Sequence, residues 1–581
     1  MRKKKRYGFS IKDLLKFYTR FPIPWWMYAI SLAAGLAYAE VALQVAKYSI
    51  SFNKGELFNS VILGYVLLTV GNSIIAAVQN IFSDTAALRI TYQARKMLWD
   101  KILHLPQAEI DKRQPSALIS GVVNDVQTAS EVLSMVFRLV SSLYAFARAV
   151  IELFKFNASL ASWMLVLIPL AVLVFTVVGR TQHAVAKRQY DSLRQMTEYF
   201  SEHISAAKNV KTQALEDREE REGLREINKR FKADLFEAFM TVVQTTVFSI
   251  YHSTSTVLIA VFGSRLIRQK QMAETGINDF DTYMEKVHQY TAENLTHYQV
   301  LRGTQGALQY VGELLEQPLE ELDRGEAVQK TDSAADLVLD HVCFSYESGV
   351  PVLNDLSLTI PGGKVTAVIG NNGSGKSTLM KLLQGIYSPD SGVIRMGQQE
   401  AAELAPHALR RQFGYILQNN PLFSGTIREN IMYGAPDADM AEITAAAELA
   451  DAMTFIRELP EGFETQVGEG GKLLSGGQRQ RIAIARTLLT QPRFLLMDEA
   501  GASLDHKSDA SIFRAVREAF RGRTIILIAH DMRSVTQADH IIVLNKGSLE
   551  AAGSHAELLK TSPTYRDYLE KQGYTGKENG A

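Results

Sequence analysis

The chain has 581 residues, enough for two or three domains. Lysine plus arginine and aspartate plus glutamate both number 62, so the net charge is zero at pH 7 and gives no sign of binding to nucleic acid. Its single cysteine, Cys343, excludes a disulfide framework within the chain. Only local patterns can therefore indicate the function.

The first segment of the chain is basic and amphipathic. Residues 2–6 are all lysine or arginine, and residues 9–21 mix apolar and basic side chains at helical spacing. Basic residues that precede a first membrane span stay on the cytoplasmic side. We expect residues 1–24 to form a cytoplasmic helix in the membrane interface, up to the turn at Pro22 and Pro24. The alternative is an ordinary surface helix.

Five later segments are apolar over about 20 residues, the length that a membrane-spanning helix needs. They are residues 27–46, 61–78, 133–151, 158–178 and 243–264. Glu40 is the one charge of the first, whereas Arg138 and Arg148 interrupt the third. These segments predict an all-α, six-helix membrane domain over residues 25–315, and they exclude a soluble protein that acts on nucleic acid.

A sixth span is needed if the basic N-terminus and the C-terminal half are to lie on the same side. The candidate, residues 279–301, is strongly polar. Read as a helix, it carries an apolar stripe on one face, and Glu285, Gln289, Glu293 and His297 recur every four residues on another. Because a charge exposed to lipid is costly, we expect this second face to line a watery cavity.

Long polar segments of helical periodicity separate the second span from the third and the fourth from the fifth. The second such segment, residues 188–234, has many opposite charges three or four residues apart. We interpret both as cytoplasmic extensions of the membrane helices. Their tips, near residues 109–119 and 206–217, are expected to touch the C-terminal part of the chain.

From about residue 337 short β-rich runs alternate with helices, which is typical of a mainly parallel α/β sheet. We assign residues 316–336 to a linker, residues 337–573 to this α/β domain and residues 574–581 to a disordered polar tail. A phosphate-binding loop, Gly370 to Thr378, follows one strand and opens a helix, the context that this motif requires. Lys376 is expected to reach the β- and γ-phosphates of a nucleotide, and Ser377 to ligate Mg²⁺.

Two further strands end in polar side chains that suit ATP hydrolysis. Asp498 and Glu499 follow an apolar strand, where Asp498 can hold Mg²⁺ through water and Glu499 can polarise the attacking water. His530 ends another apolar strand, in a position to contact the γ-phosphate. A lone histidine is more often structural, so the role of His530 depends on the other motifs.

A second glycine motif, Leu474-Ser-Gly-Gly-Gln478, is highly specific to ABC transporters. With it, the chain resembles an ABC transporter half of the bacterial exporter type over essentially its whole length. The resemblance implies that Tyr346 stacks on adenine and that Gln418 links Mg²⁺ and the attacking water to the membrane domain. It also places Asp505 in a loop that crosses a dimer interface. One departure is that Gly501 and Ala502 lack the hydroxyls common in the family, which puts fine coupling across that interface in doubt but not hydrolysis.

The resemblance implies a complete set of site residues. Catalysis falls to Glu499, His530 and Gln418, and Mg²⁺ binding to Ser377, Gln418 and Asp498. The ATP-binding residues are Tyr346, Gly370, Asn371, Gly373, Ser374, Gly375, Lys376, Ser377, Thr378, Ser475, Gly476, Gly477, Gln478 and Asp505.

The family architecture implies two ATP-binding domains arranged head to tail in the cytoplasm, beneath the cell membrane. Ser475 and Gly477 of one chain then close on the nucleotide held at Lys376 of the other. A homodimer is favoured because the catalytic motifs are intact, although a partner with degenerate motifs is compatible with them. ATP binding and hydrolysis would drive alternating access of a cavity to the two sides.

The polar sixth span is the best indication of the cargo. Charged residues within a membrane segment suggest a function, and here they favour a polar or cationic, peptide-like cargo. The predicted pathway residues are Asp281, Glu285, His288, Gln289, Glu293 and His297. One alternative is internal pairing of Glu285 or Glu293 with Arg138 or Arg148, and another is that this segment is not the sixth span. Others are export of drugs or lipids, and a non-transporting ATP-gated membrane protein.

Overall fold

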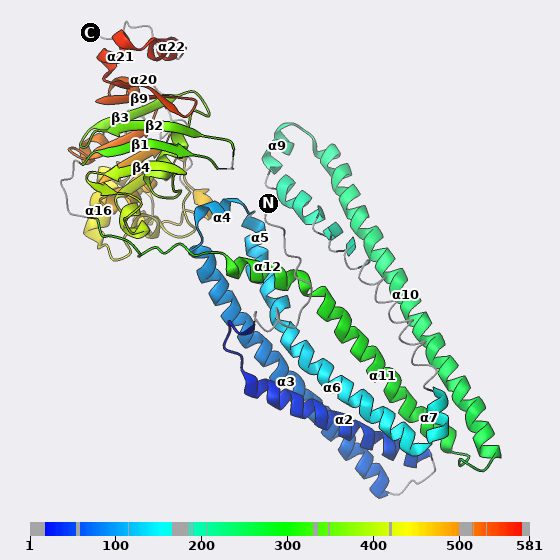
Figure 1. Ribbon diagram of the computed structural model, residues 1–581. Helices are drawn as coiled ribbons and strands as arrows, with labels where there is room; N and C mark the ends of the chain where they lie inside the picture. The colour runs from blue at the N-terminus through cyan, green and yellow to red at the C-terminus, as the bar shows by residue number, and fades with distance from the viewer. Residues whose placement is uncertain are drawn as a thin grey trace. The chain divides into compact units, whose positions relative to one another are not determined.

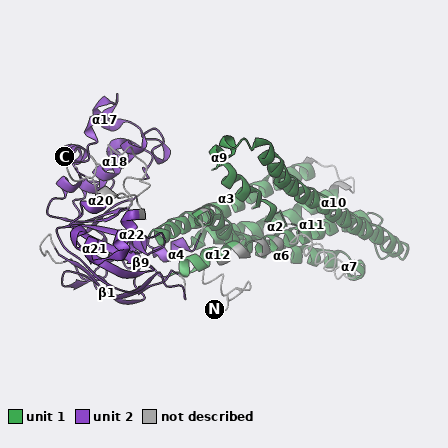
Figure 2. Cartoon of the chain, turned by 90° about the horizontal axis from the view of Figure 1, so that it is seen from above, with its two compact units in different colours: residues 1–103, 114–317 green, residues 104–113, 318–581 purple. Residues whose placement is uncertain are grey.

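The computed structural model describes residues 18–53, 59–113, 115–164, 185, 188–189, 191–193, 195–204, 206–328, 335–346, 349–417, 421–498, 514, 516–529 and 532–571. The chain divides into two compact units (Figure 1, Figure 2). The first contains residues 1–103 and 114–317, and the second contains residues 104–113 and 318–581.

The first unit is helical throughout its described part. Its helices are α2 (Trp25–Asn53), α3 (Asn59–Leu103), α5 (Pro115–Ser120), the π-helical turn η1 (Gly121–Asp125), α6 (Val126–Phe156), α7 (Ala158–Met164), α9 (Ala207–Thr212), α10 (Glu216–Arg268), α11 (Gly276–Gly303) and α12 (Gln305–Glu316). Among the described residues, four helical stretches are long and apolar enough to cross a membrane: Trp25–Ser51, Ser60–Leu103, Ala117–Phe156 and Glu216–Arg268. They contain the first, second, third and fifth predicted spans. The fourth lies mostly outside the described residues.

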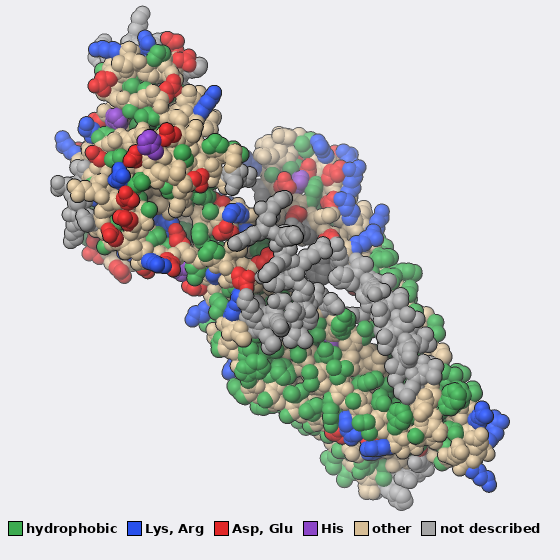
Figure 3. Space-filling view, in the orientation of Figure 1, with side chains coloured by type: hydrophobic (Ala, Val, Ile, Leu, Met, Phe, Trp, Pro, Cys, Tyr) green, Lys and Arg blue, Asp and Glu red, His purple; other side chains and the backbone are tan. Residues whose placement is uncertain are grey.

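Two of these helices are much longer than a bilayer is thick. α3 has 45 residues and α10 has 53, and at 1.5 Å per residue α10 is about 80 Å long. A span uses only about 20 residues, so both helices continue well beyond the hydrocarbon core. This confirms that the polar segments extend the membrane helices. Figure 3 shows apolar side chains gathered over the spanning part of this unit.

The core of the first unit joins α2, α6, α7, α10 and α11. The apolar stripe expected on the sixth span lies in this core, where Phe280, Tyr283, Met284, Val287 and Tyr290 are buried. α11 is too polar to meet a hydropathy criterion for a span, yet it packs along α6, α10 and α2 as a helix of 28 residues. Its apolar stripe therefore secures it to the bundle and leaves the polar face outside the core.

The described part of the second unit contains two sheets. The first is β2-β1-β4-β5 and is antiparallel; the second is β10-β9-β3-β8-β7-β6, in which only β10 runs antiparallel. The strands are β1 (Leu337–Phe344), β2 (Leu353–Ile360), β3 (Val365–Gly370), β4 (Ser391–Met396), β5 (Gln399–Glu400), β6 (Phe413–Ile416), β7 (Phe494–Asp498), β8 (Thr524–Ile528), β9 (His540–Asn545) and β10 (Ser548–Gly553). The mainly parallel sheet is confirmed for β3 and β6 to β9, whereas β1 belongs to the antiparallel sheet.

Hydrophobic cores lie on both faces of the parallel sheet, and both are lined in part by helices. These helices are α13 (Lys376–Leu383), α14 (Pro406–Arg410), α15 (Ile427–Met432), α16 (Met440–Leu449), α17 (Met453–Glu458), α18 (Gly476–Leu489), α20 (Met532–Thr536), α21 (His555–Thr561) and α22 (Pro563–Lys571). Every residue of β3 is buried, and its alternate side chains enter two separate cores: Ala367 and Ile369 one, Val368 the other. A central parallel strand covered on both faces has this uniformly apolar composition.

The second unit also includes a short segment from the first half of the chain. Helix α4 (Gln107–Asp111) lies in residues 104–113 and shares the colour of the second unit in Figure 2. Ala108 packs against the core around β1 and α13, and the carbonyl of His104 accepts a 2.8 Å hydrogen bond from the N–H of Glu320. The expectation that this tip contacts the C-terminal part of the chain is therefore confirmed. The second tip, α9, belongs to the first unit.

Candidate functional site

The phosphate-binding loop connects β3 to α13, and its backbone admits only glycine at two points. Gly370 has φ +151°, and a Cβ there would lie 2.2 Å from the carbonyl oxygen of Leu544. Gly375 has φ +101°, and its Cβ would lie 2.5 Å from the side chain of Leu353. Because Gly373 also has positive φ, the loop turns tightly and can direct consecutive N–H groups toward an anion.

The donors of this loop fit a nucleotide triphosphate. Lys376 is buried, and its Nζ donates to the carbonyl oxygens of Gly370 at 2.8 Å and Asn371 at 3.1 Å. The hydroxyl of Ser374 is buried without a hydrogen-bond partner among the described residues. A buried ammonium and an unsatisfied hydroxyl are both stabilised by acceptor oxygens, and phosphates supply these.

The carboxylate of Asp498 lies at the end of β7, in the same sheet as β3. Tyr415 on β6 donates its hydroxyl to Oδ2 of Asp498 at 3.3 Å. Burial, together with the charge of Asp498, raises the pKa of Tyr415, so its hydroxyl stays protonated and keeps the carboxylate oriented. Ser377 is exposed in the first turn of α13. A hydroxyl and one carboxylate suit Mg²⁺, which takes its other ligands from phosphates and water.

Other predicted residues of this site cannot be placed. Gln418, Glu499, His530 and Asp505 lie outside the described residues, so their roles stay predictions. In the described ranges, no three histidine, cysteine, aspartate or glutamate side chains form a metal cluster. Tyr415 was missed by the sequence analysis, because a tyrosine within an apolar strand has no motif to single it out.

Tyr346 presents a partly exposed aromatic ring beside the phosphate-binding loop. The residue is 43% exposed, and its ring stands nearly perpendicular to the rings of Phe344 and Tyr387, with centroids 5.0 and 5.2 Å away. Its hydroxyl lies 3.2 Å from the hydroxyl of Thr378, which belongs to the loop motif. The ring is thus positioned by its aromatic neighbours and its hydroxyl, and its partial exposure suits stacking of a planar base.

The second glycine motif forms the N-terminus of α18. Ser475 caps this helix: its Oγ accepts from the N–H of Gln478 at 3.3 Å, and its own N–H donates to Oε1 of Gln478 at 2.9 Å. Ser475 is exposed, and Gly476 and Gly477 begin the 14-residue helix. Such an N-terminus provides N–H groups and a positive dipole end for a phosphate.

The predicted cargo-pathway residues do not all share one surface. Glu285 and Gln289 are exposed in the single chain, and Glu293 and His297 are partly buried. The amide of Gln289 donates to Glu293 at 2.9 Å. Asp281 is partly buried and accepts from Thr256 at 3.4 Å.

His288 differs from the prediction. It is only 3% exposed, and its ring lies edge-on to Tyr251 and His252 of α10, at centroid distances of 5.1 and 5.0 Å. The polar character of the residue suggested an exposed position, but the packing of α11 on α10 covers it. His288 therefore does not share the exposed face of Glu285.

Internal pairing of Glu285 or Glu293 with the arginines of the third span is wrong. Arg148 binds Glu40 of α2 through two hydrogen bonds of 2.5 and 2.9 Å. Arg138 pairs with Asp84 of α3 at 2.7 Å. Within the described part of the chain, neither Glu285 nor Glu293 forms an ion pair, so the charge of the α11 face is not neutralised by these arginines.

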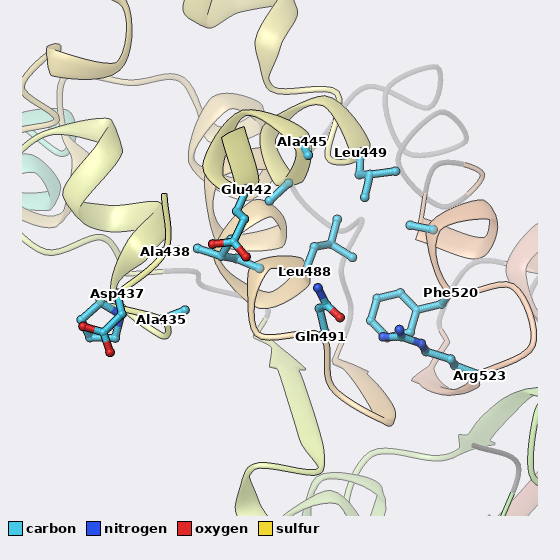
Figure 4. A pocket seen from close by; sticks show the side chains of 14 residues that line it. Ala435, Asp437, Ala438, Glu442, Ala445, Leu449, Leu488, Gln491, Phe520 and Arg523 are labelled. Atoms are coloured by element: carbon cyan, nitrogen blue, oxygen red, sulfur yellow. The ribbon is translucent and has the colours of Figure 1, made fainter. Parts of the chain in front are cut away.

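A cavity of about 650 Å³ lies elsewhere in the second unit, between α16, the end of α18 and residues 519–523 (Figure 4). Its walls are mostly alanine and leucine, with Asp437, Glu442, Gln491 and Arg523 as polar members. None of its lining residues belongs to the predicted nucleotide site. We therefore keep it separate from that site.

Comparison with known proteins agrees with the division of the chain into a helical unit and an α/β unit. Residues 28–283 match the family model for the ABC transporter transmembrane region, and residues 353–502 match the model for the ABC transporter. A multidrug resistance ABC transporter ATP-binding and permease protein of Lactococcus lactis subsp. cremoris (strain MG1363) is 28% identical over 98% of this chain and 97% of its own length.

Another relative carries a different name. A fatty acid ABC transporter ATP-binding/permease protein of Mycobacterium tuberculosis (strain CDC 1551 / Oshkosh) is 30% identical over 84% of this chain and 78% of its own length. The solved structure of a bacterial Atm1-family ABC exporter with ATP bound has a TM-score of 0.80, covering 98% of this chain and 100% of that chain at 22% identity. The likeness to that structure concerns the fold.

Proposed function

Since the chain belongs to the ABC transporter family, as a fused half-transporter of the exporter type, we propose that two copies assemble into an exporter of a polar or cationic, peptide-like cargo. The chain is a membrane protein and an ATP hydrolase whose hydrolysis is coupled to transport. We place its N-terminus and its ATP-binding domain in the cytoplasm, beneath the cell membrane, because residues 2–6 are basic.

The division of the nucleotide site supports the proposed homodimer. The chain has one phosphate-binding loop and one second glycine motif at residues 474–478, in which Ser475 is exposed. Neither motif lacks any of its characteristic residues. If each motif serves the other chain's nucleotide, two incomplete halves become two complete sites. A symmetric pair of identical chains is the simplest closed assembly with this property.

Mixing two inactive variants tests the shared site. Lys376→Met and Ser475→Arg each remove one half of both sites, so either variant alone should lose ATPase activity. Chains mixed before reconstitution should regain about a quarter of wild-type activity, because half of the dimers are mixed and each mixed dimer has one intact site. No recovery, with mixed dimers present in native mass spectra, would contradict a site shared between identical chains.

Within each site, we assign the roles from the geometry and the motifs. Lys376, Ser374 and the loop N–H groups bind the phosphates of ATP, and Tyr346 stacks on its adenine. Ser377, Asp498 and Gln418 hold Mg²⁺, which would neutralise charge on the phosphates. Glu499 orients the attacking water and accepts its proton, while His530 contacts the γ-phosphate. Ser475 and Gly477 of the second chain complete the site.

The exposed carboxylate of Glu285 on α11 is the observation that supports a cationic cargo. Glu285 has no ion pair among the described residues, whereas Glu293 is partly buried and accepts from the amide of Gln289, which in turn accepts from Lys286 at 3.2 Å. A charged side chain within a membrane segment is costly unless it faces a polar group or a water-filled cavity. Export of drugs or lipids is the second candidate, because relatives are named as multidrug and fatty acid transporters.

ATPase stimulation in lipid nanodiscs distinguishes these cargoes. The panel contains short cationic peptides, hydrophobic cationic dyes and fatty acids, with Glu499→Gln as the blank. We expect stimulation by peptides that is lost in the Glu285→Gln, Glu293→Gln double variant. The control is Glu220→Gln, an exposed glutamate at the cytoplasmic end of α10, which should respond as wild type. Stimulation by dyes or fatty acids alone, unchanged in the double variant, would overturn the cationic-cargo proposal.

A further inference from the structure

Tyr387 connects the ring of Tyr346 to the tip helix α4. It follows α13, and its ring stands nearly perpendicular to the ring of Tyr346, with centroids 5.2 Å apart and an interplanar angle of 87°. Its hydroxyl donates to Oδ2 of Asp111 on α4. The other carboxylate oxygen of Asp111 accepts from the amide of Gln107 at 2.7 Å. A continuous set of contacts thus runs from the proposed adenine site to residues 104–113.

The charges around this connection favour a hydrogen bond to an ionised carboxylate. The hydroxyl of Tyr387, more than any other group, lowers the pKa of Asp111, and the amide of Gln107 and the nearby charge of Lys381 lower it further. Burial raises the pKa of Tyr387, and its bond to Asp111 raises it too, so the hydroxyl remains the donor. A hydrogen bond from a hydroxyl to an ionised carboxylate is stronger than one between two neutral groups.

Lys381 holds the two tyrosines as one group. Its Nζ lies over the rings of Tyr346 and Tyr387, 5.2 and 5.6 Å from their centroids. The ring of Phe344 also lies roughly perpendicular to both tyrosine rings, with centroids 5.0 and 5.4 Å away. A displacement of Tyr346 therefore cannot occur without changing the contacts of Tyr387, because close-packed rings transmit displacement to their neighbours.

We propose that Tyr387 is a positioning residue through which adenine binding at Tyr346 orders the tip helix α4. Stacking of a base restricts the ring of Tyr346, the perpendicular contact restricts Tyr387, and the hydroxyl of Tyr387 fixes Asp111. The base of ATP would then transmit nucleotide binding to α4 independently of the phosphates. This inference rests on the proposed function in one respect, since it takes Tyr346 as the residue that stacks on adenine.

Hydrogen–deuterium exchange of the full-length chain in nanodiscs tests the proposal. The Glu499→Gln background prevents turnover, and exchange is compared with saturating ATP and with saturating UTP, whose smaller base stacks less well. We expect both nucleotides to protect residues 371–378, and ATP to protect residues 104–113 more strongly than UTP. Tyr387→Phe should keep ATP protection of the loop but reduce protection of residues 104–113 about fivefold, the factor for one lost hydrogen bond.

Two further variants separate this route from a general loosening. Asp111→Ala should match Tyr387→Phe, and the double variant should lose no more protection than either, because each of the three removes the same bond between Tyr387 and Asp111. The control is Tyr568→Phe, which removes a tyrosine hydroxyl that donates to the carbonyl of Ala529 at 3.5 Å in the same unit. It should leave the protection of residues 104–113 unchanged.

Each other outcome overturns a stated part of the reasoning. Full protection of residues 104–113 in Tyr387→Phe, or equal protection by ATP and UTP in the parent chain, would refute the proposed route. Loss of protection at residues 371–378 in Tyr387→Phe would make Tyr387 a nucleotide-binding residue and also refute it. Failure of ATP to protect residues 371–378 in the parent chain would instead contradict the proposed nucleotide site.

Discussion

The ion pair between Glu40 and Arg148 joins two membrane helices and gives a quantitative prediction. Glu40 is 15 residues from the start of α2 and 13 from its end, about 20 Å from either at 1.5 Å per residue. Arg148→Met removes both bonds to Glu40, at 2.5 and 2.9 Å, and leaves Glu40 only the hydroxyl of Tyr144 at 2.6 Å. The variant therefore leaves the carboxylate of Glu40 without its arginine partner near the middle of a membrane-spanning helix.

The cost follows from the burial of the two partners. Breaking a fully buried pair costs about 3–5 kcal/mol. The side chains of Arg148 and Glu40 are 24% and 39% exposed in the single chain, so we expect about 2 kcal/mol. Glu40→Gln should cost about 1 kcal/mol, because Arg148 retains Glu152 at 3.6 Å. The double variant should cost less than the sum of the two, because no charge is left unpaired.

Tryptophan fluorescence reports this change selectively. All four tryptophans, Trp25, Trp26, Trp99 and Trp163, lie in the first unit, so an SDS titration of the reconstituted chain follows the membrane unit alone. The control is Arg225→Met, whose 2.5 Å partner Glu222 lies on the surface with exposures of 70% and 42%; it should cost less than about 0.5 kcal/mol. Additive costs of Glu40→Gln and Arg148→Met would refute the coupling.

Three further predictions concern the stability of the second unit, measured by calorimetry of the full chain. Asn430→Ala should cost about 2–4 kcal/mol, because this 2% exposed side chain exchanges hydrogen bonds with Phe423 at 2.9 and 2.8 Å and accepts one from Arg486 at 2.7 Å. Gly392→Ala should cost more than about 2 kcal/mol, because φ is +84° and the new Cβ would lie 2.3 Å from the carbonyl oxygen of His341. Burial lowers the pKa of His540 and His555 from 6.5, so below that pH the unfolded chain takes up protons that the folded chain does not, and the melting temperature should fall.

Each of these has its own check. Thr444→Ala is the counterpart of Asn430→Ala and should be nearly neutral, because the partly buried Thr444 donates its hydroxyl to the carbonyl of Met440 in its own helix, α16. Gly349→Ala has φ +96° but nothing within 4 Å, so it separates backbone strain from the clash at Gly392. Replacing His540 and His555 with glutamine should flatten the acid side of the stability curve. A curve that is unchanged would show that other groups cause it.

Local patterns in the sequence predicted much of this protein. Four of the five clear spans, the long helical extensions and the strand, loop and helix around Lys376 follow from hydropathy, periodicity and glycine spacing. Each of these is a property of consecutive residues, because bilayer thickness sets the length of a span and phosphate geometry sets the spacing of the loop. The family followed from the same motifs.

Which charges meet was decided by the packing of separate helices and strands. The sequence contains Arg148, Glu40 and Glu293 without indicating which carboxylate the arginine binds, and the register of α6 against α2 made it Glu40. In the same way, the packing of α11 on α10 buried His288, and the fold brought Asp111 to Tyr387, 276 residues along the chain. Hydropathy and spacing act along the chain, whereas ion pairs and hydrogen bonds need a distance of a few ångströms that only the tertiary structure supplies.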